Sequence, residues 1–338
     1  MMSGNEDKTG VIDILRLFFS VYITASHTLY FNCVGEYNIL AVLSNVFRYP
    51  VPFFFVASGF FAFRKMEGYY GENNNLARLK FIINRMIRRY IVWSILGLPF
   101  AIFEFIYWKT GFVMAFFLYC RDFVFRGEHY LGAPTWYLLS SIYALILIYC
   151  VLKMSNSEKN IFYLISISLL VYYIIKPGSV FEKIICENKI CNLIYINSVG
   201  MYGSRLFRGI WLISVGMLLA KYLKTENKLI IISCSILLEL ISLMYNNEVS
   251  EMVGAVALFT IAYCIPLSVS RISIWVRRMS AVVYYTHMFF VPLYLYIYDG
   301  KYSGGVFYCT IFSSILVGIV INICIDNNIL KKWFLLLV

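Results

Sequence analysis

The chain has 338 residues, of which 61% are hydrophobic and 14% charged, and its net charge is +11. This composition, with a mean hydropathy of +0.75, excludes a soluble globular domain and is typical of a helical membrane protein. In that class an excess of lysine and arginine lies in cytoplasmic loops beside anionic lipid, so we expect membrane lipid and no nucleic acid as a partner.

Apolar runs long enough for helices recur along the whole chain. We predict an all-α, polytopic membrane protein with about ten transmembrane helices at residues 11–31, 39–63, 90–107, 134–152, 161–175, 209–223, 229–245, 252–270, 279–298 and 306–325. The segment 111–125 is shorter and is interrupted by Arg121 and Asp122, so we interpret it as interfacial or re-entrant. We expect residues 1–338 to form a single transmembrane domain with no separate soluble domain.

Basic residues predict the orientation of the helices. The segment 64–89 is rich in lysine and arginine and poor in acidic residues, which indicates a cytoplasmic position. The other segments that then fall on the cytoplasmic side also carry lysine or arginine, at 153–159, 221–228, 271–278 and 331–332. Ten helices with both termini in the cytoplasm satisfy this pattern.

The first apolar run carries five polar side chains on one side of the predicted helix. At about 100° per residue they fall within an arc of roughly 80°, and we call them the polar ribbon: Asp13, Arg16, Ser20, Thr24 and His27. Such groups are costly in hydrocarbon, so we expect them to be hidden from lipid. The ribbon then lines a water-accessible passage or pocket, or it is a line of paired groups. Arg16 lies near the cytoplasmic side and His27 in the outer half, roughly 16 Å apart along the axis.

Several motifs along the chain resemble one known family. They are Arg16-x10-His27 in the first helix, Phe54-Phe55-x-x-Ser58-Gly59 in the second, Arg85-x-x-Arg88 in the basic segment, TWYLL at 135–139 and YYTHMFFV at 284–291. In this order they are similar to the acyltransferase type 3 family of membrane proteins, over most of the chain except 176–208. The resemblance implies an enzyme of the bacterial plasma membrane that transfers an acyl group, commonly acetyl, from acyl-CoA to a hydroxyl of a cell-surface polysaccharide or its lipid-linked precursor.

The resemblance also implies roles for the first helix. His27 would be the catalytic general base, because neutral imidazole can take the proton of the acceptor hydroxyl at neutral pH. A covalent acyl-imidazole is a less favoured variant, and a hydrogen-bonded packing residue is the alternative without function. Arg16 would hold an anionic part of the donor or pair with Asp13, or its side chain could reach the inner interface.

Arg85 and Arg88 are the predicted binding residues for the phosphates of acetyl-CoA or another acyl-CoA. Their spacing puts both on one helical face. The alternative is that they serve topology and contact with anionic lipid.

The remaining candidates have two interpretations each. Glu239 is either the partner of a buried arginine or part of the acceptor pocket, and His287 either packs or lines the same cavity as His27. Glu128 and His129 could meet the sugar or belong to a solvated loop. Arg205 and Arg208 could hold an anionic acceptor, such as a lipid-linked sugar phosphate, or anchor a helix end.

The nine cysteines show no metal-ligand spacing, and we predict no metal site. A disulfide between Cys186 and Cys191 is an alternative to unpaired thiols. Two rival functions remain open. One is a transporter or flippase of the same topology for a glycan precursor or a small acyl-bearing molecule, and the other is a membrane sensor or module for another enzyme. Neither the acyl group, nor the acceptor, nor the oligomeric state is predicted.

Overall fold

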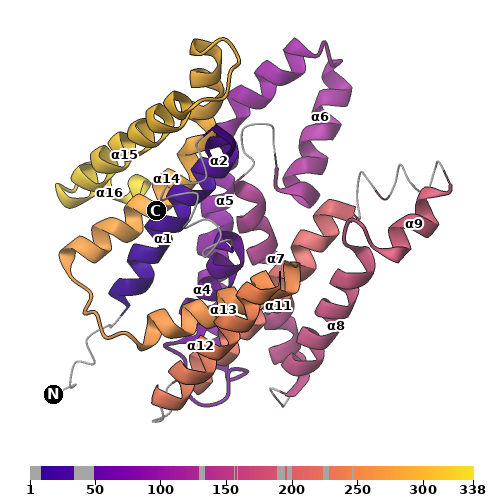
Figure 1. Cartoon of the computed structure of the whole chain (residues 1–338), viewed down its shortest axis with the longest axis vertical. Coiled ribbons are helices and arrows are strands. Elements are labelled where there is room, and N and C mark those ends of the chain that lie inside the picture. The colour runs from indigo at the N-terminus through magenta and orange to yellow at the C-terminus, as the bar shows by residue number, and fades with distance from the viewer. Residues whose placement is uncertain are drawn as a thin grey trace. The chain divides into compact units, whose positions relative to one another are not determined.

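The computed structural model describes residues 9–33, 49–128, 134–155, 157, 159–188, 195, 200–223, 228–245 and 247–338. Within these ranges the regular structure is helical throughout, which confirms the all-α prediction (Figure 1). The contacts divide the chain into two compact units: unit 1 consists of Met1–Phe54 with Glu226–Val338, and unit 2 of Phe55–Thr225. Whether the whole chain acts as one domain stays a prediction.

The helices of unit 1 come from both ends of the chain. They are α1 (Gly10–His27), α2 (Tyr30–Cys33), α12 (Lys228–Met244), α13 (Glu248–Cys264), α14 (Arg271–Ile297), α15 (Gly304–Asp326) and α16 (Lys331–Phe334). The boundary between the units falls inside α4 (Pro50–Phe63). Unit 2 continues with α5 (Asn73–Tyr107), α6 (Phe112–Arg121), the π-helix η1 (Asp122–Arg126), α7 (Thr135–Met154), α8 (Lys159–Ile175), α9 (Val180–Cys186) and α11 (Gly200–Tyr222).

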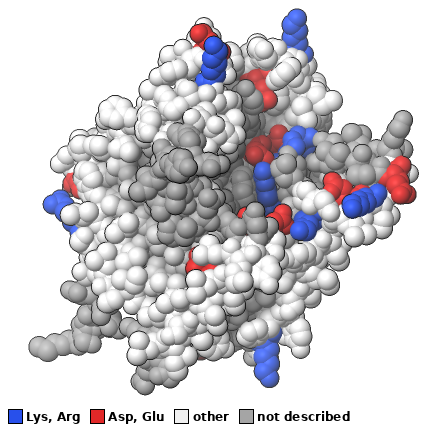
Figure 2. All heavy atoms as spheres, in the orientation of Figure 1, with Lys and Arg blue, Asp and Glu red and all other residues white. Residues whose placement is uncertain are grey.

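Six of the described helices are long and apolar enough to cross a membrane: α1, α5, α7, α11, α14 and α15. Three shorter apolar helices lie in α4, α8 and α12. Large apolar side chains are exposed on the outside, for example Phe103 (67%), Phe112 (86%) and Leu229 (81%). The face drawn in Figure 2 is largely free of charge. Such surfaces are suited to contact with lipid, so the structure supports a membrane protein with several spanning helices.

The first predicted span is too long by four residues. α1 ends at His27, and a separate short helix begins at Tyr30. Thr28 is the C-cap residue, and its hydroxyl donates to the carbonyl oxygens of Thr24 and Ala25 in the last turn. Leu29 then takes a positive φ of 50°, which turns the chain away from the helix axis.

The basic segment 64–89 is not all loop. Asn75 donates to the carbonyl oxygens of Glu67 and Tyr69, which fixes the turn before α5, and the helix runs without a break from Asn73 to Tyr107. Leucine, arginine, lysine and methionine favour helix in this stretch. The predicted span 90–107 is therefore only the second half of a 35-residue helix.

Helix caps explain two further shifted boundaries. Asn247 and Ser250 form a capping box at the start of α13, and Ser270 and Ser273 form another at the start of α14. The predicted spans 252–270 and 279–298 therefore begin earlier, at 248 and 271, and the first also ends earlier, at Cys264. The span predicted at 39–63 is described only from residue 49, and its helix begins at Pro50.

In unit 1, α1 lies alongside α14 (Figure 1). Ser20 Oγ donates to the carbonyl oxygen of Ser280 at 2.8 Å, and the rings of His27 and His287 lie 5.3 Å apart between centroids. The histidine contact lies seven residues after the serine contact on both helices. The two helices therefore run in the same direction and keep one register over two turns.

In unit 2, two glycines let α4 and α11 approach closely. A Cβ atom on Gly59 would meet the carbonyl oxygen of Ile213, and a Cβ atom on Gly216 would meet the carbonyl oxygen of Val56. Close backbone contact at small residues is a common way for membrane helices to associate. Helix α4 also contacts α7. The ring of Phe55 on α4 packs 4.8 Å from the ring of Tyr137 on α7, and the hydroxyl of Tyr137 bonds to Ser58 on α4.

Substitution of Gly59 or Gly216 by alanine should destabilise the fold, because the added methyl group has no space between the two backbones. We expect a loss of about 1–3 kcal/mol in the free energy of unfolding, measured by thermal unfolding in detergent. Gly97→Ala in α5 is the matched control, since no heavy atom lies within 4 Å of its added Cβ. Equal stability of all three variants would refute the close contact of α4 with α11.

Candidate functional site

The polar ribbon of α1 is largely covered. Asp13, Ser20 and Thr24 are fully buried, and the side chain of Arg16 is 16% exposed. Ser20 bonds to α14, as described above, and Thr24 Oγ1 donates to the carbonyl oxygen of Ser20 in its own helix. Between residues 13 and 24 the ribbon is therefore a line of paired groups packed against α14, which was one of the two alternatives. His27, at the end of the ribbon, is exposed.

Asp13 holds the charges at the start of the ribbon together. Its Oδ1 lies 3.8 Å from Nη1 of Arg16 and 4.0 Å from Nε of Arg277 on α14. A fully buried carboxylate is costly unless cations compensate it, and these two guanidinium groups do so. The structure therefore places Arg16 beside Asp13, one of its predicted partners, and adds Arg277, which the sequence interpretation had assigned to a loop.

His27 and His287 form the second feature of this face. His27 is the last residue of α1, whereas His287 lies inside α14 and is completely buried. Nδ1 of His287 lies 3.2 Å from the carbonyl oxygen of Val283, one turn earlier. The structure thus brings two of the predicted site residues together, one accessible and one enclosed.

A groove runs along another side of α1. It has a volume of about 650 Å³, and its walls include Leu17 and Val21 of α1, Trp275 and Met279 of α14, and Ile315 of α15. No residue of the polar ribbon lines it. The groove is apolar except where Arg271 and Asp326 close one end, so it suits hydrocarbon better than an aqueous substrate path.

Arg85 and Arg88 lie in unit 2, on the first half of α5, and both are exposed. Their helical context confirms that they share one face. Within the described residues neither takes part in an ion pair, so both are accessible to an anionic ligand. Glu239 is half-buried on α12, which packs along α13 in unit 1.

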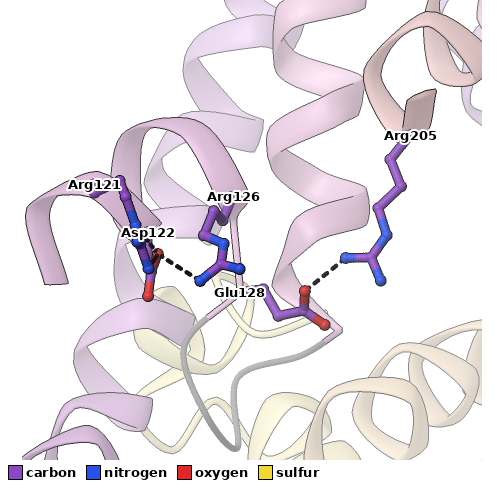
Figure 3. Close-up of polar contacts among 5 residues, drawn as sticks. All are labelled: Arg121, Asp122, Arg126, Glu128 and Arg205. Carbon is purple, nitrogen blue, oxygen red and sulfur yellow. Dashed lines mark hydrogen bonds and ion pairs between the residues drawn. The ribbon is translucent and has the colours of Figure 1, made fainter. Parts of the chain in front are cut away.

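A cluster in unit 2 combines two ion-pair networks that the sequence did not predict as a group. Asp122 pairs with Arg121 at 2.7 Å and with Arg126 at 3.4 Å, while Glu128 pairs with Arg205 at 2.6 Å (Figure 3). The guanidinium of Arg205 also lies 4.7 Å above the ring of Trp136, a cation–π contact.

This cluster is built on η1, which side chains from two helices hold in place. Tyr90 of α5 donates to the carbonyl oxygen of Phe123, Tyr143 of α7 to that of Val124, and Thr135 of α7 to that of Gly127. The segment 111–125 is thus α6 followed by a π-helix. A π-helix has poorer backbone hydrogen bonds than an α-helix, and these hydroxyl groups satisfy the carbonyls it exposes.

Three predicted features lie outside the described residues. His129 and Cys191 are among them, and so is the side chain of Cys186, so the disulfide stays a prediction. In the part of the chain that is described, no group of three or more histidine, cysteine, aspartate or glutamate residues is placed to hold a metal ion.

No family model matches the chain, and no solved structure matches it. A curated protein of Enterococcus faecalis named "Amino-acid racemase" is 28% identical over 142 residues, which are 42% of this chain and 19% of that protein. The chain therefore spans about a fifth of the length of the curated relative it matches.

The pairing of Asp13 with Arg277 predicts energetic coupling between α1 and α14. Asp13→Asn and Arg277→Gln should each lower the melting temperature in detergent, and the double variant should show a coupling energy of about 0.5–3 kcal/mol. The control cycle combines Asp13→Asn with Arg278→Gln, because Arg278 bonds to Asp326 instead. Additive effects in both cycles would contradict the ion pair.

Proposed function

We propose that this protein is an acyltransferase of the type 3 kind. It moves an acyl group, acetyl in the simplest case, from acyl-CoA to a hydroxyl of a cell-surface polysaccharide or its lipid-linked precursor. The observation that carries the proposal is the position of His27. It follows Arg16 after ten residues, as in the family motif, and it is the exposed end of a ribbon whose other members are largely buried. Of the ribbon, His27 is thus the residue a substrate can reach.

The chemistry assigned to His27 is general-base catalysis. One ring nitrogen takes the proton of the acceptor hydroxyl while the oxygen attacks the thioester carbonyl. The carbon–sulfur bond then breaks, and the thiolate of coenzyme A leaves and takes up the proton. Arg16 does not touch the reacting carbon in this scheme. It lies 3.8 Å from Asp13, whose carboxylate also faces Arg277 of α14, and this favours a structural role over binding of the donor.

The donor binds through Arg85 and Arg88. Two exposed guanidinium groups on one helical face can contact the phosphates of coenzyme A, and guanidinium is well suited to bidentate contact with phosphate. The acyl donor is a substrate of the reaction, and the proposal needs no metal ion.

The proposed setting is the bacterial plasma membrane, with about ten spanning helices and both termini in the cytoplasm. All ten predicted apolar runs overlap described helices, although only six of these helices reach full spanning length. The first and ninth spans of this topology must run in the same direction, and α1 and α14 do so. This agreement supports the order of the spans.

The acceptor is proposed to be a glycan. The transporter alternative needs a permeation path along the polar ribbon. The bond between Ser20 and Ser280 occupies that position, so such a path would lie elsewhere in the molecule.

Replacement of His27 by alanine tests the proposal directly. His27→Ala should insert and unfold like the wild type, yet lose about 10²–10⁴-fold in transfer rate, the typical contribution of a general base. The assay is label transfer from labelled acetyl-CoA to a glycan acceptor by purified protein in detergent, where no membrane gradient exists. Ser26→Ala, at the exposed neighbouring position, is the control. Transfer retained by His27→Ala would remove His27 from catalysis.

Replacement of both Arg85 and Arg88 by alanine should raise the KM for acyl-CoA at least about tenfold with little change in kcat, because charge-assisted hydrogen bonds contribute roughly 1.5–3 kcal/mol each. The control variant replaces Lys65 and Lys80, two exposed lysines of the same basic segment, and removes the same charge. If both double variants raise KM equally, the effect is one of general charge and the assigned site is wrong.

A further inference from the structure

His287 is a buried polar side chain, and one of its two ring nitrogens lacks a hydrogen-bond partner among the described residues. Its ring is 0% exposed, and its Nε2 has no hydrogen-bond partner in the described part of the chain. A buried acceptor or donor without a partner is destabilising, so such a group in a helix core calls for an explanation. A packing residue alone would be better served by leucine or phenylalanine.

The contact with Val283 determines which nitrogen carries the hydrogen. A carbonyl oxygen can only accept, so Nδ1 of His287 must be the donor in the bond to Val283. In the neutral ring Nε2 then has a lone pair and is a hydrogen-bond acceptor. His287 therefore offers an acceptor inside the protein at a defined position.

The neighbour that can donate to this acceptor is His27. The two ring centroids lie 5.3 Å apart, and the rings are tilted by 36°. His27 is exposed, so its ring has room to rotate and direct one N–H group at Nε2 of His287. When one nitrogen of His27 donates in this way, the other keeps its lone pair for a substrate.

The backbone holds this arrangement in register. The bond from Ser20 to Ser280 fixes α1 against α14 two turns before the histidines. Thr28 caps the last turn of α1 directly after His27. The approach of the two rings is thus a consequence of helix packing and not of side-chain conformation alone.

We propose that His287 is a positioning residue for His27: its Nε2 accepts a hydrogen bond from His27 and keeps His27 in the single tautomer whose other nitrogen faces the substrate. The same bond stabilises the imidazolium that forms when His27 takes up the hydroxyl proton, in the way a base is oriented by a third group in a catalytic triad. The catalytic part of this inference rests on the proposed function, whereas the tautomer part does not.

Nitrogen NMR of the full-length protein in detergent micelles tests the tautomer. The chain has three histidines, so ¹⁵N labelling of the imidazole rings yields a simple spectrum that single substitutions assign. We expect His287 to carry its hydrogen on Nδ1 and His27 to show one tautomer. His287→Phe, which keeps the ring volume without the acceptor, should convert His27 to an averaged mixture of tautomers. His287→Gln, which places an amide oxygen near the position of Nε2, should restore the single form.

Two NMR results would overturn the inference. One is a hydrogen on Nε2 of His287, and the other is a His27 spectrum that is the same in the wild type and in a folded His287→Phe variant. Thermal unfolding shows which variants are folded. His287→Gln remains informative if His287→Phe does not fold, because loss of the single tautomer in the glutamine variant also contradicts the role of the acceptor.

The acyl-transfer assay tests the catalytic part. His287→Phe should lower kcat about 10²-fold with unchanged KM for acyl-CoA, and His287→Gln should recover most of it. An unchanged kcat in folded His287→Phe would overturn the positioning role. If the NMR coupling holds but His27→Ala still transfers the acyl group, the proposed function fails, while the effect of His287 on the tautomer of His27 stands.

Discussion

The burial of polar groups between α1 and α14 is the constraint on which unit 1 depends. An apolar helix that carries Asp13, Arg16 and Ser20 cannot face lipid on that side, because hydrocarbon offers no hydrogen bonds and no compensating charge. α14 supplies both, through the carbonyl oxygen of Ser280 and the guanidinium of Arg277. The two helices are therefore matched by chemistry as well as by shape.

This match also determines direction and register. A slip by one residue would turn Ser20 away from Ser280 and leave the carboxylate of Asp13 buried without Arg277. Such a slip is strongly disfavoured, since an uncompensated buried charge costs several kcal/mol. Helix α15, the antiparallel neighbour of α14, is aligned in a similar way. Trp275 and Arg278 at the start of α14 both donate to Asp326 at the end of α15. Polar contacts thus align α1, α14 and α15, whose remaining apolar side chains specify the register less strictly.

Local periodicity in the sequence predicted which face of a helix is polar or buried. It did not predict which other helix packs against that face. The arc of the polar ribbon and the burial of its first members followed from helix geometry, since spacing along one helix determines its faces. The identity of α14 as the covering helix could not be predicted, because periodicity defines a face but not its neighbour 260 residues away. Asn247 and Ser270 are typical N-cap residues, and they could have predicted the starts of α13 and α14 from the sequence. The π-helix η1 could not be predicted from the sequence, because its backbone is held by hydroxyl groups of other helices, those of Tyr90, Thr135 and Tyr143.

The structure divides the Arg16–His27 motif into two parts with different physical positions. At one end Arg16 is mostly enclosed and lies beside the buried carboxylate of Asp13, which compensates its charge. At the other end His27 is exposed, and its neighbour is a buried imidazole rather than an anion. A group that must take a proton and return it requires access and a neutral environment, whereas a group that holds two helices together requires a fixed opposite charge. The two residues therefore need no shared role: Arg16 lies beside Asp13, which pairs with Arg277 of α14, and the packing of α1 on α14 places His27 beside His287.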